Sequence, residues 1–182
     1  MKPFVVSVAD LVHRPASRRD ERLVGPTSAL VVTQTIVPEG AILTVDVRIE
    51  AVSDGVLVHG TAEATWETTC RRCLEPVNGP VSATFREMYS EKPVEGETYP
   101  IRHDAVDLEL VAREAILLDL PLAPLCREGC AGLCVTCGAN LNDGACSCPA
   151  VATDLRWVGL EGLRFNGDTN EGIEPGASAS SN

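Results

Sequence analysis

The chain has 182 residues, of which 45% are hydrophobic and 23% charged, a composition that supports one packed domain with an appendage and argues against wholesale disorder. Fifteen Lys and Arg against 26 Asp and Glu give a formal net charge of −11, which argues against sequence-independent binding of nucleic acid by bulk electrostatics. Only 4% of the residues are aromatic, so base stacking is not expected to be the main means of recognition. An RNA contact would need a local basic segment or a basic partner protein.

The N-terminal segment predicts a short strand followed by the one clearly positive stretch of the chain. Residues 4–8 are apolar except for Ser7, which favours a strand. Up to residue 27, five cations stand against three anions, a net charge of +2. The arginines here are candidates for contact with RNA or a partner protein, and the alternative is that they lie in a solvated loop. They are Arg14, Arg18, Arg19 and Arg22.

Four further segments predict an antiparallel sheet or partial barrel. From Ala41 to Ala51 apolar residues occupy every odd position, the period of a strand with one face in the core. Asp54-Gly55 then favours a hairpin turn, because glycine adopts positive φ without a steric cost. Residues 56–69 alternate again, with an inner face of Val56, Val58, Gly60, Ala62, Ala64 and Trp66. Strands are also expected over 29–37 and 81–89, the latter with Val81, Ala83 and Phe85 inward.

A helix is predicted after this sheet. Residues 90–106 are acidic and contain proline, which is typical of a loop, and Asp107 is a suitable N-cap for a helix that runs to about Asp119 and ends before Pro121. One stripe of the helix is apolar, and we expect it to cover the open face of the sheet. The stripe consists of Leu108, Val111, Ala112, Ala115 and Leu118. The predicted fold class is therefore α+β.

The rest of the chain predicts a cysteine-rich zinc module and a tail. We expect four regions: a β-rich domain with its closing helix (1–121), the cysteine-rich module (122–149), a short amphipathic helix (150–165) and a disordered tail (166–182). The apolar run before Asp10 is too short for a signal peptide, and no apolar run approaches the length of a bilayer span. We therefore expect a cytoplasmic protein.

Eight cysteines are the strongest chemical signal in the sequence: Cys70, Cys73, Cys126, Cys130, Cys134, Cys137, Cys146 and Cys148. In a reducing compartment clustered thiols hold metal more often than they form disulfides. Two Cys-x2-Cys pairs have the spacing at which a tight turn presents two sulfurs to one ion, so we expect two structural Zn²⁺ ions, each bound by four thiolates. An iron–sulfur cluster also accepts four thiolates and stays a less favoured alternative.

The pairing of the cysteines is left open by the sequence. A local group of Cys134, Cys137, Cys146 and Cys148 is favoured because a short loop separates its halves, which leaves Cys70 and Cys73 to join Cys126 and Cys130. The alternative joins the two Cys-x2-Cys pairs in one ribbon. Arg71 and Arg72 are expected to compensate the charge of a thiolate group, and the rival role is contact with RNA phosphate.

Catalytic alternatives find little support in the sequence. Cys130-x3-Cys134-x2-Cys137 matches the cysteine spacing of radical-SAM enzymes, but too little chain follows it for the large barrel that those enzymes need. A thioredoxin-like redox pair requires Cys-x2-Cys at the start of a helix, whereas Cys70 ends a predicted strand. The histidines, His13, His59 and His103, are expected at the surface, and no nucleophile–base pair can be nominated. We therefore predict that the chain is not an enzyme.

Several stretches of sequence combine into a specific set. They are Cys70-Arg71-Arg72-Cys73-Leu74-Glu75-Pro76-Val77, Asp107-Leu108 with Arg113-Glu114 and Leu117, Leu120-Pro121-Leu122-Ala123-Pro124-Leu125-Cys126, and Gly132-Leu133-Cys134-Val135-Thr136-Cys137-Gly138-Ala139-Asn140-Leu141-Asn142. Together they resemble the YceD-like family, also called large ribosomal RNA subunit accumulation proteins. Pro15-Ala16-Ser17-Arg18-Arg19 is similar to a Pro-Gly-Ser-Arg-Arg stretch of its actinobacterial-type members, with Ala16 in place of Gly. The resemblance covers roughly residues 4–165.

The resemblance implies a cytosolic bacterial protein that supports synthesis, processing or accumulation of large-subunit ribosomal RNA, and it carries over no active site. Expected partners are the precursor of the large ribosomal subunit, its ribosomal RNA, or a basic ribosomal protein bound by the acidic face. Neither a membrane nor a small-molecule substrate is expected. The alternative function is a redox- or zinc-responsive thiol regulatory protein, in which oxidation releases metal and changes binding. An RNA-processing enzyme is a second rival.

Overall fold

The structure is a computed structural model that describes residues 3–12, 14 and 16–149. The chain divides into two compact units, Met1–Cys146 and Ser147–Asn182, and the fold described below is that of the first. Its elements are β1 (Val5–Ser7), α1 (Ala9–Val12), β2 (Arg18–Pro26), β3 (Leu30–Val32), β4 (Thr35–Val37), β5 (Ile42–Val52), β6 (Gly55–Thr69), β7 (Pro76–Ser90), β8 (Tyr99–Pro100), β9 (Ala105–Asp107) and α2 (Glu109–Asp119). The predicted amphipathic helix and tail lie outside the described residues. Within the described ranges, every helix is too short or too polar to cross a membrane.

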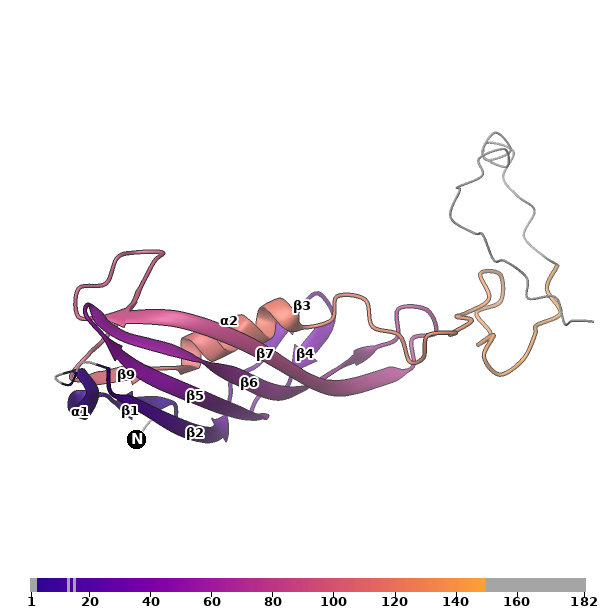
Figure 1. Cartoon of the computed structure of the whole chain (residues 1–182). Coiled ribbons are helices and arrows are strands. Elements are labelled where there is room, and N and C mark those ends of the chain that lie inside the picture. The colour runs from indigo at the N-terminus through magenta and orange to yellow at the C-terminus, as the bar shows by residue number, and fades with distance from the viewer. Residues whose placement is uncertain (1–2, 13, 15, 150–182) are drawn as a thin grey trace, which may run out of the picture. The chain divides into compact units, whose positions relative to one another are not determined.

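Seven strands form one sheet around the long pair β6 and β7 (Figure 1). β7 runs antiparallel to β6 along nearly its whole length, from Val56↔Tyr89 to Thr69↔Pro76. On the other edge of β6, β5 pairs with its first part and β4 meets it at Glu67, with β2 beyond β5 and β3 beyond β4. The short β8 pairs with β7 in parallel, while β1 and β9 form a separate antiparallel pair. The predicted α+β class is confirmed: the described part of the chain forms a mostly antiparallel sheet together with two helices.

One face of the sheet is buried because apolar residues alternate along its three long strands. The core positions of β5, from Leu43 to Ala51, and of β6, from Val56 to Ala64, are buried apart from Gly60. Val81, Ala83 and Phe85 continue this core on β7, as predicted. Helix α2 packs against β7, β6 and β3, and its buried residues join the same core. The predicted closing helix is therefore present.

Two details of the helix prediction are wrong. Leu118 is 86% exposed although it lies only about 20° around the helix axis from buried Val111, so this side of the apolar stripe ends before the last turn. Ile116, about 40° from buried Ala112, is buried instead. The N-cap is Leu108 rather than Asp107, and it makes no side-chain capping bond. The Asp107 carboxylate still accepts a hydrogen bond from the Glu109 N–H at 3.1 Å. An acceptor for the first turn is thus supplied one position before the N-cap.

Several strands differ from the prediction. Residues 18–26 form the strand β2, whereas the sequence suggested either a binding segment or a solvated loop here. In β2, Asp20 lies opposite Arg48 of β5, and Arg22 lies opposite Asp46. Cross-strand charge pairs support this strand without alternating apolar residues. The predicted strand 29–37 is a hairpin of β3 and β4, since Thr33 has a φ of 55°. β7 begins at Pro76, before the predicted start. Within the predicted loop 90–106, the structure has the whole of β8 and the first two residues of β9.

Candidate metal centres

The first cysteine group joins the turn between β6 and β7 to the segment that follows α2. Cys70 and Cys73 stand in that turn, and Cys126 and Cys130 follow the helix. The four Sγ atoms lie within 4.8 Å of one another, with 3.8 Å between those of Cys70 and Cys130 and 3.5 Å between those of Cys73 and Cys126. Four sulfurs placed about 2.3 Å from one ion at the corners of a tetrahedron are about 3.8 Å apart. The spacing therefore fits a tetrahedral four-thiolate site.

Burial supports the same interpretation of the first group. Cys70, Cys73 and Cys130 are 0%, 4% and 2% exposed, while Cys126 is at the surface. Val77, Leu125 and Leu133 pack against the three buried cysteines, in a cluster separate from the main core. All eight cysteines are free thiols. A small apolar cluster built on thiols is too small to hold two chain segments together by itself, which favours a bound ion as the link.

Both Cys-x2-Cys motifs fold into the same turn. Three hydrogen bonds of the first cysteine define this turn. Its N–H donates to the carbonyl of the residue five positions later. Its carbonyl accepts from the N–H four positions later, and its Sγ accepts from the N–H two positions later. The partners are Glu75 O (2.8 Å), Leu74 N (3.0 Å) and Arg72 N (3.4 Å) for Cys70, and Ala139 O (2.8 Å), Gly138 N (2.9 Å) and Thr136 N (3.4 Å) for Cys134. Backbone N–H groups directed at sulfur favour the thiolate form that binds metal.

The residue after each motif has a left-handed backbone. Gly138 has a φ of 73°, as the sequence predicts for a glycine at this place, and Leu74 at the equivalent place has a φ of 62°. The Leu74 side chain is 61% exposed, so it gains little from burial. A leucine with this backbone is strained, which indicates that the hydrogen bonds of the turn and the contacts among the sulfurs outweigh that strain.

The electrostatics of the first group leave its thiols in unequal states. Burial opposes ionisation of Cys70, but N–H groups of Cys73 and Arg72 outweigh it and lower the Cys70 pKa to about 6. The side-chain amide of Asn142 lowers the pKa of Cys130. Cys126 shares a contact with the Cys73 sulfur, which raises the Cys126 pKa to about 12. Four thiolates this close repel one another, and a divalent cation among them would remove that repulsion.

The second group comprises Cys134, Cys137, Cys146 and Cys148, whose sulfurs also lie within 4.8 Å of one another. Backbone N–H groups of Cys137 and Thr136 lower the pKa of Cys134 to about 6. Cys137 is exposed and the other three are partly exposed, so this group is more open than the first. In the part of the chain that the structure describes, these two groups are the places where three or more His, Cys, Asp or Glu side chains could hold a metal ion. The grouping is the one favoured from the sequence, not the alternative ribbon.

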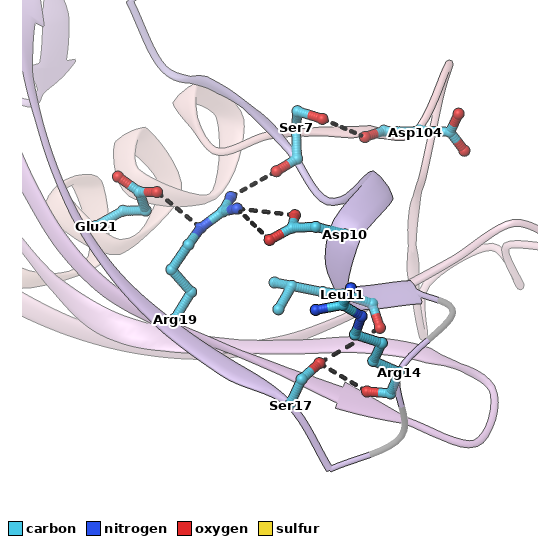
Figure 2. A network of polar contacts seen from close by, with 8 residues as sticks. All are labelled: Ser7, Asp10, Leu11, Arg14, Ser17, Arg19, Glu21 and Asp104. Carbon is cyan, nitrogen blue, oxygen red and sulfur yellow. Dashed lines mark hydrogen bonds and ion pairs between the residues drawn. The ribbon is translucent and has the colours of Figure 1, made fainter.

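The arginines of the N-terminal segment are placed differently from one another. Figure 2 shows Arg19 within a network in which its Nη1 binds Asp10 Oδ1 at 2.9 Å, its Nη2 donates to Ser7 O at 2.5 Å and its Nε contacts Glu21 Oε1 at 2.8 Å. Arg22 forms an exposed ion pair with Asp46 at 3.2 Å. Arg14 and Arg18 are both exposed. Arg19 therefore holds the N-terminal turn against β2, and its charge is offset by two carboxylates.

The other candidate residues lie as follows. Arg72 Nη1 donates to the Cys130 carbonyl at 2.9 Å, so its guanidinium is engaged beside the first group, while Arg71 is exposed. His103 is exposed in a turn, His59 is half-buried on β6, and His13 lies outside the described residues. Asn142 ends one of the motifs that resemble the family, but the sequence assigned it no role; it contacts the first group from the loop of the second.

Comparison with known proteins places these features in a family. The family model described as "Large ribosomal RNA subunit accumulation protein YceD" matches residues 58–164. An uncharacterized protein of Mycobacterium tuberculosis is 35% identical over 147 residues, which cover 76% of this chain and 71% of that protein. An uncharacterized protein of Mycobacterium leprae is 35% identical over 149 residues, covering 78% and 69%.

A plant protein is a more distant relative. The Arabidopsis thaliana protein named "Large ribosomal RNA subunit accumulation protein YCED homolog 1, chloroplastic" is 22% identical over 169 residues, covering 75% of this chain and 53% of that protein. No solved structure matches the chain. The family match spans more than half of the chain, from β6 through both cysteine groups. The chain belongs to the YceD family.

Proposed function

We propose that this chain is a non-enzymatic factor that supports the synthesis, processing or accumulation of large-subunit ribosomal RNA, and that its two cysteine groups hold structural Zn²⁺. The observation that carries the proposal is the family match, because residues 58–164 include all eight cysteines as well as β7, α2 and most of β6. The named plant relative supports the ribosomal part of the proposal, since its name refers to accumulation of the large-subunit RNA.

Structural metal is supported by the completeness of the donor sets. Each group offers four sulfurs, which fill a tetrahedral site and leave no position for a substrate or an activated water. The repeated Cys-x2-Cys turn favours zinc over an iron–sulfur cluster, although four thiolates also suit the latter. The ligands are proposed to be Cys70, Cys73, Cys126 and Cys130 in one site, and Cys134, Cys137, Cys146 and Cys148 in the other.

A docking role accounts for the remaining features. A Zn²⁺ with four thiolates has a net charge of −2, so two such sites change the formal charge from −11 to −15. An acidic surface of this kind attracts a basic ribosomal protein rather than bare RNA. If the N-terminal segment contacts the RNA of a large-subunit precursor, Arg14 and Arg18 are the better candidates, because Arg19 and Arg22 are ion-paired. The proposed platform is the β-rich domain 1–121, with the cysteine module 122–149 attached to it.

The test is a ribosome profile of bacterial cells with and without this chain, in which ribosomal RNA is probed across a sucrose gradient. The proposal expects fewer mature large subunits and abnormal levels of large-subunit RNA without the chain, both restored by the native sequence. A Cys70→Ser/Cys73→Ser chain is expected not to restore them. Normal profiles under rapid growth would refute the proposal and favour the thiol regulator. Cleavage of precursor RNA by the purified, metal-loaded chain would instead favour an enzyme.

The arginine segment has its own comparison within that experiment. Arg14→Gln/Arg18→Gln is compared with Arg86→Gln/Arg102→Gln, which removes the same charge from two exposed arginines elsewhere. A contact with RNA or a partner predicts weaker co-sedimentation with large-subunit precursors for the first pair only. Equal co-sedimentation of both variants would show that the segment is a solvated surface.

A further inference from the structure

Asn142 belongs to the loop of the second cysteine group and contacts a sulfur of the first. It lies between Cys137 and Cys146 in the sequence, yet its Nδ2 donates to Cys130 Sγ at 3.4 Å. This hydrogen bond restricts the rotation of the Cys130 side chain, and so helps to keep its sulfur close to the other three sulfurs of the group. The contact therefore joins the loop of one candidate metal site to a ligand of the other.

The orientation of the Asn142 amide is determined by four partners. Its Oδ1 accepts from the Ala131 N–H at 2.9 Å and from Arg127 Nη2 at 2.8 Å, both in the segment around Cys130. Its Nδ2 donates to Asn140 Oδ1 at 2.7 Å as well as to the sulfur. The oxygen faces two donors and the nitrogen faces two acceptors, so a flipped amide would lose all four bonds.

Backbone bonds hold the same loop against the first group. The Leu141 N–H donates to Gly132 O at 2.9 Å, and Leu133 and Asn140 form an isolated antiparallel bridge. The Leu133 N–H in turn donates to the carbonyl of Arg72, within the first Cys-x2-Cys motif, at 3.1 Å. The loop of the second group, the strand-like segment after Cys130 and the first turn thus form one hydrogen-bonded layer.

We propose that Asn142 is a positioning residue for the first cysteine group, and that metal binding by the second group strengthens metal binding by the first through it. The inference rests on the metal binding proposed above. Four ligands on one ion close the loop between Cys137 and Cys146, which lowers the entropy lost when Asn142 reaches Cys130. Coupling between two binding sites is reciprocal, so the first group strengthens the second by the same factor.

The test loads the full chain with ¹¹³Cd²⁺, which gives each group its own NMR resonance, and follows the loss of each resonance to a competing chelator. Cys134→Ser/Cys137→Ser removes the second group and so assigns the resonance of the first. Asn142→Asp keeps an oxygen for Ala131 and Arg127 but replaces the donor to Cys130 by an acceptor. Asp143→Asn, at the adjacent exposed residue, is the matched control.

We expect Asn142→Asp to weaken Cd²⁺ binding by the first group about 10- to 100-fold, the effect common for residues that orient a metal ligand, and Asp143→Asn to leave it unchanged. Removal of the second group is expected to weaken the first similarly, with no further loss when Asn142→Asp is added. Asn142→Ser gives the same comparison if the aspartate disturbs folding, which the circular dichroism of the sheet reports.

Two results would overturn the inference. One is an Asn142→Asp chain whose first group binds Cd²⁺ as tightly as that of Asp143→Asn. The other is a pair of losses that multiply when Asn142→Asp is combined with removal of the second group, since independent effects are additive in free energy. A native chain that binds no Cd²⁺ would refute the proposed metal binding itself, and is distinguished from both by the absence of any resonance.

Discussion

Replacing Leu74 by glycine is expected to strengthen metal binding by the first cysteine group. Leu74 follows Cys73 with a φ of 62°, where a residue with a Cβ costs about 1–2 kcal/mol relative to the right-handed region. Glycine removes that cost but gives the unfolded chain more freedom, which offsets about 0.4–1 kcal/mol. The net gain is about 1 kcal/mol, or roughly a fivefold lower dissociation constant where the turn forms only with metal.

Two substitutions separate backbone strain from side-chain contacts. Leu74→Ala keeps the Cβ and is expected to leave affinity unchanged, because the leucine side chain is 61% exposed. Gly138→Ala is the reverse change in the second turn, where a Cβ would meet no atom within 4 Å, so only its φ of 73° opposes alanine. It is expected to weaken the second group by about as much as Leu74→Gly strengthens the first.

The assay is competition of the loaded full chain with a chelator of known affinity, supported by thermal unfolding of the same samples. Weaker binding by Leu74→Gly, or equal gains from Leu74→Gly and Leu74→Ala, would show that the backbone of Leu74 is not the source of strain in the turn. Either result would mean that the leucine side chain, rather than its backbone, determines the behaviour of the turn.

Three further predictions concern the metal and the fold. Chelation is expected to speed amide hydrogen exchange over 70–75 and 122–149, because these residues depend on the cysteine groups for their structure. The middle of β5, β6 and β7 is expected to stay protected, because it belongs to the main core. Loss of protection in all of these segments alike would contradict this. Metal affinity is expected to fall as the pH is lowered and to fall more steeply below about 6, where Cys70 and Cys134 take up protons in addition to the thiols of higher pKa, and a slope that does not change between pH 7 and 5 would contradict the pKa values of these two thiols. Tyr89→Phe is expected to lower the free energy of unfolding by about 1 kcal/mol, because the buried hydroxyl donates to the Asp107 carbonyl at 3.0 Å. Urea denaturation measures this change, and an unchanged free energy of unfolding would show that water replaces the hydrogen bond.

Strict alternation made the long strands predictable. β5 and β6 bury one residue in two over most of their length. Asp54-Gly55 correctly predicted a reversal between them, but the turn is one residue earlier, at Ser53-Asp54, and Gly55 begins β6 opposite Val52. β2 has no such pattern, because it depends on charges that lie opposite one another on β5, and a partner strand is not visible from local sequence. Thr33 is a residue type that rarely adopts positive φ, so the hairpin of β3 and β4 had no local signal either.

The two groups of cysteines were predictable from the sequence, but their surroundings were not. Cysteine spacing alone favoured the two groups that the structure brings together. The left-handed backbone of Leu74 could not be predicted from the sequence, because glycine, the usual signal for such a turn, is absent after Cys73. Asn142 contacts Cys130 only because the loop after Cys137 folds back against the segment that contains Cys130, and no residue spacing reports that contact.

The most direct test of the two proposed zinc sites is the metal content of the full chain, purified without chelators and measured together with its reactive thiols. We expect two Zn²⁺ per chain and eight thiols that react slowly until the metal is removed. A chain that carries no metal and whose eight thiols react at once would contradict it, as would disulfides within either group.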